Sequence, residues 1–231
     1  MAEKDKGFRL EEIAYIHTDF PAKFGIPRQS GLADTKAEIV FAPKYRSPDA
    51  CKGLEEFSHL WLIWGFSGAV REKWSPTVRP PRLGGNKRVG VFASRSPFRP
   101  NPVGLSCVAL ERLEKREGKG IVLHVRGADL MDGTPIYDIK PYLPYVDCRR
   151  EASGGFAERM KGYGLQVEIP SVWLEMIPKE HREILAQVLS QDPRPSYQDD
   201  PRRVYGMEYA GMEVRFQVQG NILRVCEIEC R

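Results

Sequence analysis

Six strand-like segments follow one another within the first 145 residues, without the alternation of strands and helices that a parallel sheet requires. They are Phe8–His17, Glu38–Ala42, His59–Phe66, Val89–Ala93, Val103–Leu110 and Ile121–Val125. Each is apolar or β-branched and is bounded by turn residues, which is typical of short strands. The segment 59–66, HLWLIWGF, is nearly all apolar, so we expect it to be buried on both faces. The charged, Gly-containing stretch EKREGKG predicts a hairpin after residue 110. This order favours a β-barrel or a sandwich.

The character of the sequence changes near residue 146. The stretch CRREASGGFAERMKGYG is polar and Gly-rich, which indicates a linker or mobile loop. Pro178–Gln191 follows as an amphipathic helix with Ile184, Leu185, Val188 and Leu189 on one face. Further strands run from Val204 to Ile228, with turns at Gly211 and at 219–221. We therefore predict a mainly β domain over residues 1–148, a linker over 149–170 and a small α+β domain over 171–231.

Positive charge is concentrated in one part of the chain. The 231 residues carry a net charge of only +4, but the segment 71–102 contains eight Lys or Arg residues and one acidic residue, Glu72. Such a local excess favours a polyanion or a phosphate as partner. The alternative is a basic loop that only keeps the surface soluble.

Residues 89–106, VGVFASRSPFRPNPVGLS, lie within and just beyond this basic segment. Pro97, Pro100 and Pro102 fix three φ angles and favour extended geometry in the residues before them. Arg95 and Arg99 therefore project from a stiff backbone. A rigid cationic loop of this kind suits an anionic or nucleotide-like ligand.

Four further clusters combine polar groups with residues that restrict the backbone: 27–31 (PRQSG), 80–86 (PPRLGGN), 129–142 (DLMDGTPIYDIKPY) and 192–197 (DPRPSY). Within the third, Asp132-Gly133-Thr134-Pro135 predicts a turn whose backbone groups can read the edge of an adenine. A plain hairpin turn is the alternative. For 192–197 the alternative is a helix stop followed by a Pro-rich connector.

Several common chemistries are disfavoured. The chain has no GxGxxG, GxxxxGK[ST] or HExxH motif, and its four histidines and five cysteines show no metal-ligand spacing. We expect no bound metal and reduced, mostly buried thiols. The N-terminal MAEKDKGFRL lacks an apolar signal core, and no run approaches membrane-spanning length, so we expect a cytoplasmic protein.

The clusters, in this order, resemble the TrmO family, also called YaeB or TsaA-like. The resemblance covers most of the chain and is carried by FGIPRQSGL (24–32), GLEEFSHLWLIW (53–64), PTVRPPRLGGN (76–86), GVFASRSPFRPNPVGLS (90–106), DLMDGTPIYDIKPYLPY (129–145) and QDPRPSY (191–197). It implies a dimeric tRNA methyltransferase that binds S-adenosylmethionine in a closed or near-closed β-barrel instead of a Rossmann domain. The reaction implied is methylation of N6 of threonylcarbamoyladenosine at position 37 of threonine tRNA.

Carried over by position, the resemblance predicts the cofactor contacts: Pro27, Arg28, Gln29, Ser67, Gly68, Arg95, Leu105, Asp132, Gly133, Thr134 and Pro135. Ser67 stands where many relatives have a histidine. Either Arg28 or Arg95 suits the methionyl carboxylate of the cofactor, and either suits the threonine carboxylate of the modified base.

For the tRNA, we expect contacts from Arg79, Arg82, Lys87, Arg88, Arg99, Lys140, Tyr142, Arg194 and Tyr197. The cations would meet phosphates, and the aromatic rings would stack on anticodon-loop bases. Transfer of methyl from a sulfonium is a displacement that needs neither metal nor covalent intermediate, but a proton must leave N6. Asp138 is the first candidate for the base and Asp132 the second.

Two other interpretations stay open. A non-catalytic RNA-binding or S-adenosylmethionine-sensing module could share this fold, and it would bind the cofactor without methylating tRNA. A hydrolase of small phosphorylated compounds would need a metal or nucleophile that the sequence does not offer. The sequence does not decide whether two subunits share each active site.

Overall fold

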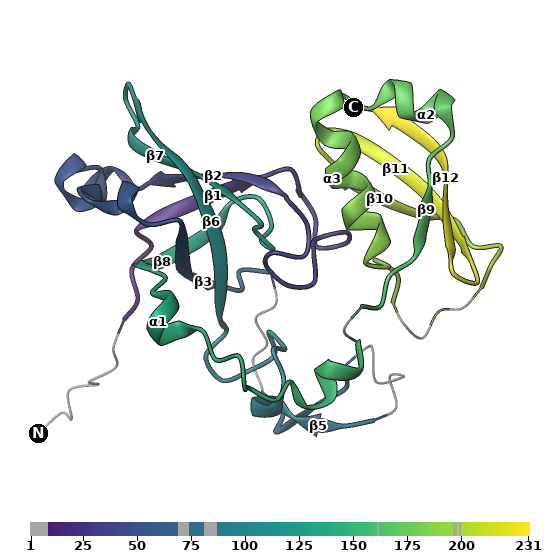
Figure 1. The fold of residues 1–231 in the computed structure, drawn as a ribbon, viewed down its shortest axis with the longest axis horizontal. Coiled ribbons are helices and arrows are strands. Elements are labelled where there is room, and N and C mark those ends of the chain that lie inside the picture. The colour runs from purple at the N-terminus through teal and green to yellow at the C-terminus, as the bar shows by residue number, and fades with distance from the viewer. Residues whose placement is uncertain (1–8, 69–73, 81–86, 161, 196–197, 199) are drawn as a thin grey trace, which may run out of the picture.

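The computed structural model describes residues 9–68, 74–80, 87–160, 162–195, 198 and 200–231, which form a β-barrel followed by a second, smaller β-sheet with helices (Figure 1). The strands are β1 (Ala14–Thr18), β2 (Lys36–Phe41), β3 (His59–Gly65), β4 (Thr77–Val78), β5 (Val89–Gly90), β6 (Val103–Arg116), β7 (Gly120–Arg126), β8 (Thr134–Pro141), β9 (Gln166–Glu168), β10 (Tyr205–Tyr209), β11 (Met212–Gln219) and β12 (Ile222–Cys230). The α-helices are α1 (Pro144–Asp147), α2 (Ser171–Met176) and α3 (Lys179–Ser190). Short 3-10 turns cover Pro43–Tyr45, Pro48–Cys51, Leu54–Glu56, Val91–Ala93 and Gly155–Met160.

Six strands close into the barrel in the order β1-β2-β7-β6-β3-β8, which confirms the closed-barrel prediction. Closure is made by β1 and β8, where Ile16 pairs with Thr134. Alternate residues point inward because side chains alternate across a strand. Inward residues such as Ile39, Leu62 and Leu123 are fully buried in the core.

The strand β3 differs from expectation. Leu60 and Leu62 are buried, but Trp61 and Ile63 between them are only partly covered, so the prediction of burial on both faces was wrong. A single-layer barrel packs its inner face, and here the outer face is covered only in part. The Trp61 indole donates a hydrogen bond to Asp147 of α1 at 3.0 Å.

The expected strand over 89–93 also differs. Only Val89 and Gly90 pair, with β4, and residues 91–93 form a 3-10 turn. The prolines that follow cannot donate to a ladder, so the chain runs on as an ordered loop to residue 102. The expected hairpin is confirmed, since β6 pairs with β7 as far as Arg116 and Gly120.

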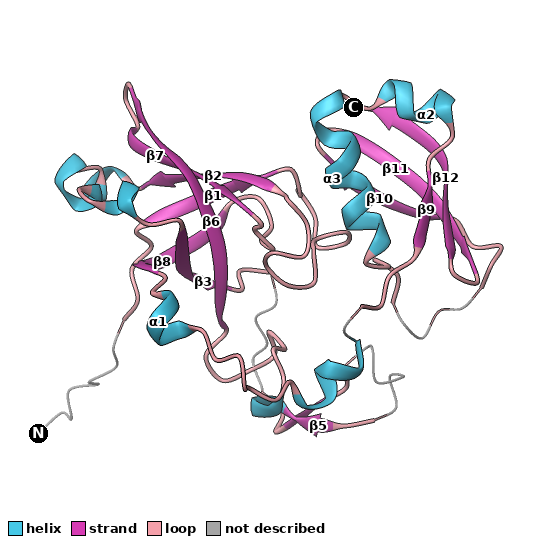
Figure 2. Cartoon of the chain, viewed as in Figure 1, coloured by secondary structure: helices cyan, strands magenta, loops and turns pink. Residues whose placement is uncertain are grey.

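The C-terminal part has a four-stranded sheet in the order β10-β11-β12-β9 (Figure 2). The helix α3 confirms the predicted amphipathic segment, and its buried residues Leu185 and Leu189 pack in one core cluster with Phe216 of β11 and Leu223 of β12. Residues 149–170 are more structured than a linker: β9 pairs in parallel with β12 and so belongs to this sheet. Within the described ranges no helix is both long and apolar enough to span a membrane.

The loop between β1 and β2 joins the two parts. Phe20 and Ala33, at its two ends, are buried in the C-terminal core. The backbone N–H of Ala210 donates to Asp19 O at 2.9 Å, and Asp34 N–H donates to Gln187 Oε1 at 2.8 Å. The segment 27–31 therefore lies between barrel and C-terminal domain.

Candidate active site

Two neighbouring cavities share Pro97 in their walls. The larger encloses about 810 Å³ and is lined by Gln29, Trp74, Ser75, Thr77, Val78, Arg79, Pro80, Arg88, Ser94, Arg95, Ser96, Pro97, Phe98, Arg99, Pro100, Pro102 and Phe156. The smaller encloses about 230 Å³ and is lined by Lys23, Ile26, Pro27, Trp64, Gly65, Phe66, Ser67, Gly68, Pro97, Asp129, Leu130, Met131 and Thr134. The two cavities are therefore neighbours that share one wall residue.

The smaller cavity gathers several of the predicted cofactor residues from separate parts of the chain. Pro27 comes from the β1–β2 loop, Ser67 and Gly68 follow β3, and Thr134 begins β8. The turn at 132–135 is confirmed: Gly133 has a φ of +72°, and Thr134 N–H donates to Met131 O at 3.2 Å.

Asp129 is the one acidic side chain among the described residues that line either cavity. The Trp64 indole donates to Ser106 Oγ at 3.0 Å, and Ser106 Oγ donates in turn to Asp129 Oδ1 at 2.5 Å. Burial raises the pKa of the Asp129 carboxyl, although hydrogen bonds from Ser106 and the backbone and the charge of Arg95 act against that shift. Our sequence analysis missed Asp129 as a site residue. It opens the quoted motif 129–142, but its burial beside an aromatic wall is a tertiary feature.

The larger cavity is cationic and aromatic. It is lined by four arginines, Arg79, Arg88, Arg95 and Arg99, together with three aromatic rings. Arg95 donates to Gln29 Oε1, which links the proline-rich loop to the β1–β2 loop. Arg99 donates to Ser94 O at 3.1 Å and to Ser96 O at 3.3 Å, so it also braces its own loop. The structure thus brings Gln29 and Arg95 together with three of the predicted RNA contacts.

Other predicted residues lie elsewhere. Arg28 donates to the carbonyls of Asp192 and Arg194 at 2.5 and 3.1 Å, at the domain junction. Arg194 is buried and pairs with Asp192 at 2.8 Å, so the structure places it inside the protein and away from an RNA surface. Burial alone would raise the pKa of Asp192, but hydrogen bonds from Arg194 and Tyr163 hold it below its usual range.

The two base candidates are outside the cavity walls. Asp138 on β8 forms an ion pair with Lys140 at 2.9 Å, and both side chains are substantially exposed. Asp132 accepts the Thr18 N–H at 3.1 Å and so fastens the 132–135 turn to β1. Neither is among the described residues that line a cavity.

The remaining predicted residues are dispersed. Leu105 on β6 is 58% exposed, Gly133 N–H donates to Ile16 O, and Pro135 pairs with Tyr15 in the barrel. Tyr142 packs against Trp61, with ring centroids 5.7 Å apart. Lys87 is exposed. Arg82 and Tyr197 lie outside the described residues.

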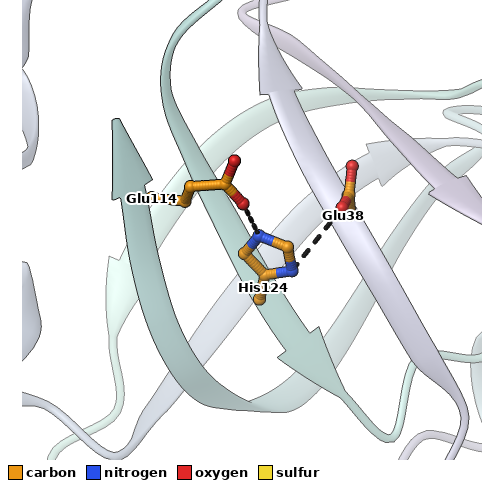
Figure 3. Close-up of side chains that lie close together, drawn as sticks. All are labelled: Glu38, Glu114 and His124. Atoms are coloured by element: carbon orange, nitrogen blue, oxygen red, sulfur yellow. Dashed lines mark hydrogen bonds and ion pairs between the residues drawn. The ribbon is translucent and has the colours of Figure 1, made fainter. Parts of the chain in front are cut away.

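In the described part of the chain, side chains that could bind a metal ion lie close together at one place, on the strands β2, β6 and β7. Glu38, Glu114 and His124 have ligand atoms within 4.8 Å of one another (Figure 3). Arg116, however, donates to Glu38 at 2.8 and 2.9 Å and to Glu114 at 2.8 and 2.9 Å. The guanidinium supplies the positive charge there, so the group is a salt-bridge network.

Comparison with known proteins covers both domains. Residues 15–148 match the tRNA-methyltransferase O N-terminal domain, and residues 165–231 match the TrmO C-terminal domain. The chain is 38% identical to a tRNA (adenine(37)-N6)-methyltransferase of Escherichia coli K12, over 97% of this chain and 99% of that protein. It is 39% identical to a protein of Pseudomonas aeruginosa named putative S-adenosylmethionine-dependent methyltransferase RcsF, over 95% and 96% of the two chains.

The solved structures agree with the sequence relatives. A crystal structure of TrmO from P. aeruginosa superposes with a TM-score of 0.79 at 33% identity, and the match covers 97% of this chain and 98% of that one. Both domains and their order are therefore shared along nearly the whole length. The chain belongs to the tRNA-methyltransferase O family.

Proposed function

We propose that the protein transfers a methyl group from S-adenosylmethionine to N6 of adenine 37 in tRNA. The observation that carries this proposal is the pair of cavities that meet at Pro97. One is small, with aromatic and aliphatic walls, one carboxylate, Asp129, and one ammonium group, Lys23. The other is lined by arginines and aromatic rings, the side chains that meet phosphates and stack on bases in RNA sites.

The residues of the smaller cavity fit part of the cofactor. Trp64, Phe66 and Leu130 offer apolar surface for an adenine or a methylene chain. When bound, S-adenosylmethionine supplies an electrophilic methyl group on a positively charged sulfur. The chain itself aligns the two reactants and excludes water. Such alignment is worth about 7–11 kcal/mol in favourable intramolecular reactions.

The positive charge of the larger cavity supports a more specific assignment of the substrate. We propose that the target adenosine carries a threonylcarbamoyl group, because a guanidinium suits its carboxylate as a bidentate partner. Arg95 is the arginine that supports this best, since it lines the cavity and is oriented by Gln29. Arg28 is held at the domain junction instead. The preference for threonine tRNA and the homodimer stay predictions.

Methyl transfer to defined tRNAs tests the proposal. Threonine tRNA with and without the threonylcarbamoyl modification is incubated with S-adenosylmethionine labelled in the methyl group, and the tRNA is digested to nucleosides. We expect label on N6 of the modified adenosine at position 37 only. Cofactor binding without label in any tRNA would support the non-catalytic module instead.

A further inference from the structure

Asp129 differs from the other carboxylates because it lines the smaller cavity, where burial disfavours its charged form. The side chain lies among Trp64, Leu130 and Met131, where a charged group loses hydration. The Ser106 hydroxyl donates to the carboxylate and offsets part of that loss, and the backbone amides of Ser30 and of Asp129 itself also lower its pKa.

The donor chain fixes where the carboxylate points. Trp64 on β3 donates to Ser106 on β6, and Ser106 donates to Asp129 at 2.5 Å. All three residues come from different strands or loops of the barrel, so the orientation of Asp129 depends on the closed barrel. Ser106 donates to one carboxylate oxygen, Oδ1. Among the described residues, no side chain donates a hydrogen bond to the other oxygen of Asp129.

Asp129 belongs to the smaller cavity and is linked electrostatically to the larger one. It lines the smaller one, and it interacts electrostatically with Arg95, which lines the larger one. With a cofactor in one cavity and a target nucleotide in the other, methyl transfer would take place where the two cavities adjoin, near Pro97. A base for the nucleotide has to lie near this place, and Asp129 is the one acidic side chain among the described residues that line the two cavities.

We infer that Asp129 is the general base that takes the N6 proton, with Ser106 as the residue that positions it. This inference rests on the proposed methyltransferase function. The N6–methyl bond forms while the bond between sulfur and methyl breaks, and that electron pair stays on sulfur as a neutral thioether. The N6 proton passes to the Asp129 carboxylate and from there to water. No oxidant, metal or further reactant is required.

The Asp129→Asn substitution tests the role, because an amide keeps the size and the Ser106 contact but cannot accept the proton. We expect kcat to fall by about 10²-fold or more. Calorimetric titration should show S-adenosylmethionine and S-adenosylhomocysteine bound with unchanged affinity. As a matched control, Asp147→Asn alters a carboxylate on α1, outside the cavity walls, that accepts a hydrogen bond from the Trp61 indole, and this variant should keep full activity.

Ser106→Ala supplies a second readout. The hydroxyl favours the ionised carboxylate, so its loss raises the pKa of Asp129 further and should move the acid limb of the kcat profile to higher pH. The charge of Arg95 lowers the pKa of Asp129, and Lys23 lines the same cavity as Asp129; both cations remain in this variant. In Asp129→Asn the acid limb should disappear.

The possible outcomes distinguish a failure of the base assignment from a failure of the proposed methyltransferase function. Absence of methyl transfer by the unsubstituted protein would remove the proposed function. An active unsubstituted protein with undiminished kcat in Asp129→Asn would overturn the base alone. Loss of cofactor affinity as large as the loss of rate would also overturn it, since Asp129 would then be a cofactor ligand. Loss of activity in Asp138→Asn but not in Asp129→Asn would restore Asp138 as the base.

Discussion

At the scale of single residues, the shape of the smaller cavity depends on a glycine in the barrel. Gly104 on β6 pairs with Trp64 on β3, and a Cβ at Gly104 would overlap the Trp64 ring. The indole therefore lies flat over the glycine, where it forms a cavity wall and reaches Ser106. The glycine has no unusual backbone conformation, so its role is close packing.

Gly104→Ala should displace Trp64, lower the stability of the fold and change the shape of the smaller cavity. Overpacking of this kind costs about 1–3 kcal/mol of unfolding free energy. Urea unfolding measures that loss, and calorimetry should show weaker binding of S-adenosylmethionine. Gly164→Ala is the matched control, because its new Cβ would meet only Ser190 O at 3.4 Å. An unchanged cofactor affinity in Gly104→Ala would contradict the role of Trp64.

Sequence patterns predicted the residues that act through local geometry. Pro97 and its neighbours stiffen the loop that presents Arg95 and Arg99, and both arginines line a cavity. Arg194 was placed on the RNA surface by its flanking prolines, but its partner Asp192 is chosen by tertiary packing. Asp129 was missed for the same reason. Burial and pairing depend on elements far apart in the chain, and local spacing does not encode them.

At the scale of elements, β2, β6 and β7 are tied together by the salt-bridge network around Arg116, whose members Glu38, Glu114 and His124 are drawn in Figure 3. Hydrogen bonds from Arg116 and His124 lower the pKa of Glu114 from 4.5 to about 2, and a hydrogen bond from Arg116 lowers the pKa of Glu38. A carboxylate with a lowered pKa stabilises the native state above its unfolded-state pKa. That stabilisation is lost as the pH falls through the native value.

Arg116→Gln should therefore destabilise the barrel at pH 7 more than at acid pH. The difference in unfolding free energy between the variant and the unsubstituted protein should shrink as the pH falls from about 4.5 towards 2. Urea unfolding at pH 7 and pH 3 measures it. A difference that is equal at both pH values would show that the network does not couple to stability.

The overall element pattern was predictable because its signals are local. Turn residues and apolar runs located five of the six barrel strands, and the four apolar residues of α3 are buried as predicted. The short strand β9 was missed within residues 149–170. Three residues carry too little pattern, and β9 exists because β12 offers it a parallel partner.

At the scale of the whole molecule, the C-terminal domain reaches the cavities through Arg28. Its neighbours Pro27 and Gln29 line the smaller and the larger cavity, while its guanidinium donates to two carbonyls of the C-terminal domain. The position of the segment 27–29 is thus set by both domains together.

Arg28→Met should lower both stability and the rate of methyl transfer. The carbonyls of Asp192 and Arg194 would lose a hydrogen-bond donor, and the segment 27–29 would lose this contact with the C-terminal domain. Loss of such a partner costs about 1–3 kcal/mol. Arg46→Met is the matched control: Arg46 also donates to two carbonyls, those of Phe41 and Gly118, but within the barrel domain. Thermal unfolding and kcat are measured for both. Equal losses of kcat in the two variants would contradict a special role for the junction.

Closure of the barrel by its first and last strands has a consequence for how the protein is made. Ile16 finds its partner Thr134 only after most of the N-terminal domain has been synthesised. Contacts so distant in the chain form slowly. Leu130, Met131 and Thr134 arrive just before or with the closing strand, so the smaller cavity is incomplete on a nascent or open barrel. A ligand that binds only the closed form stabilises it by mass action, so cellular S-adenosylmethionine should raise the yield of finished protein.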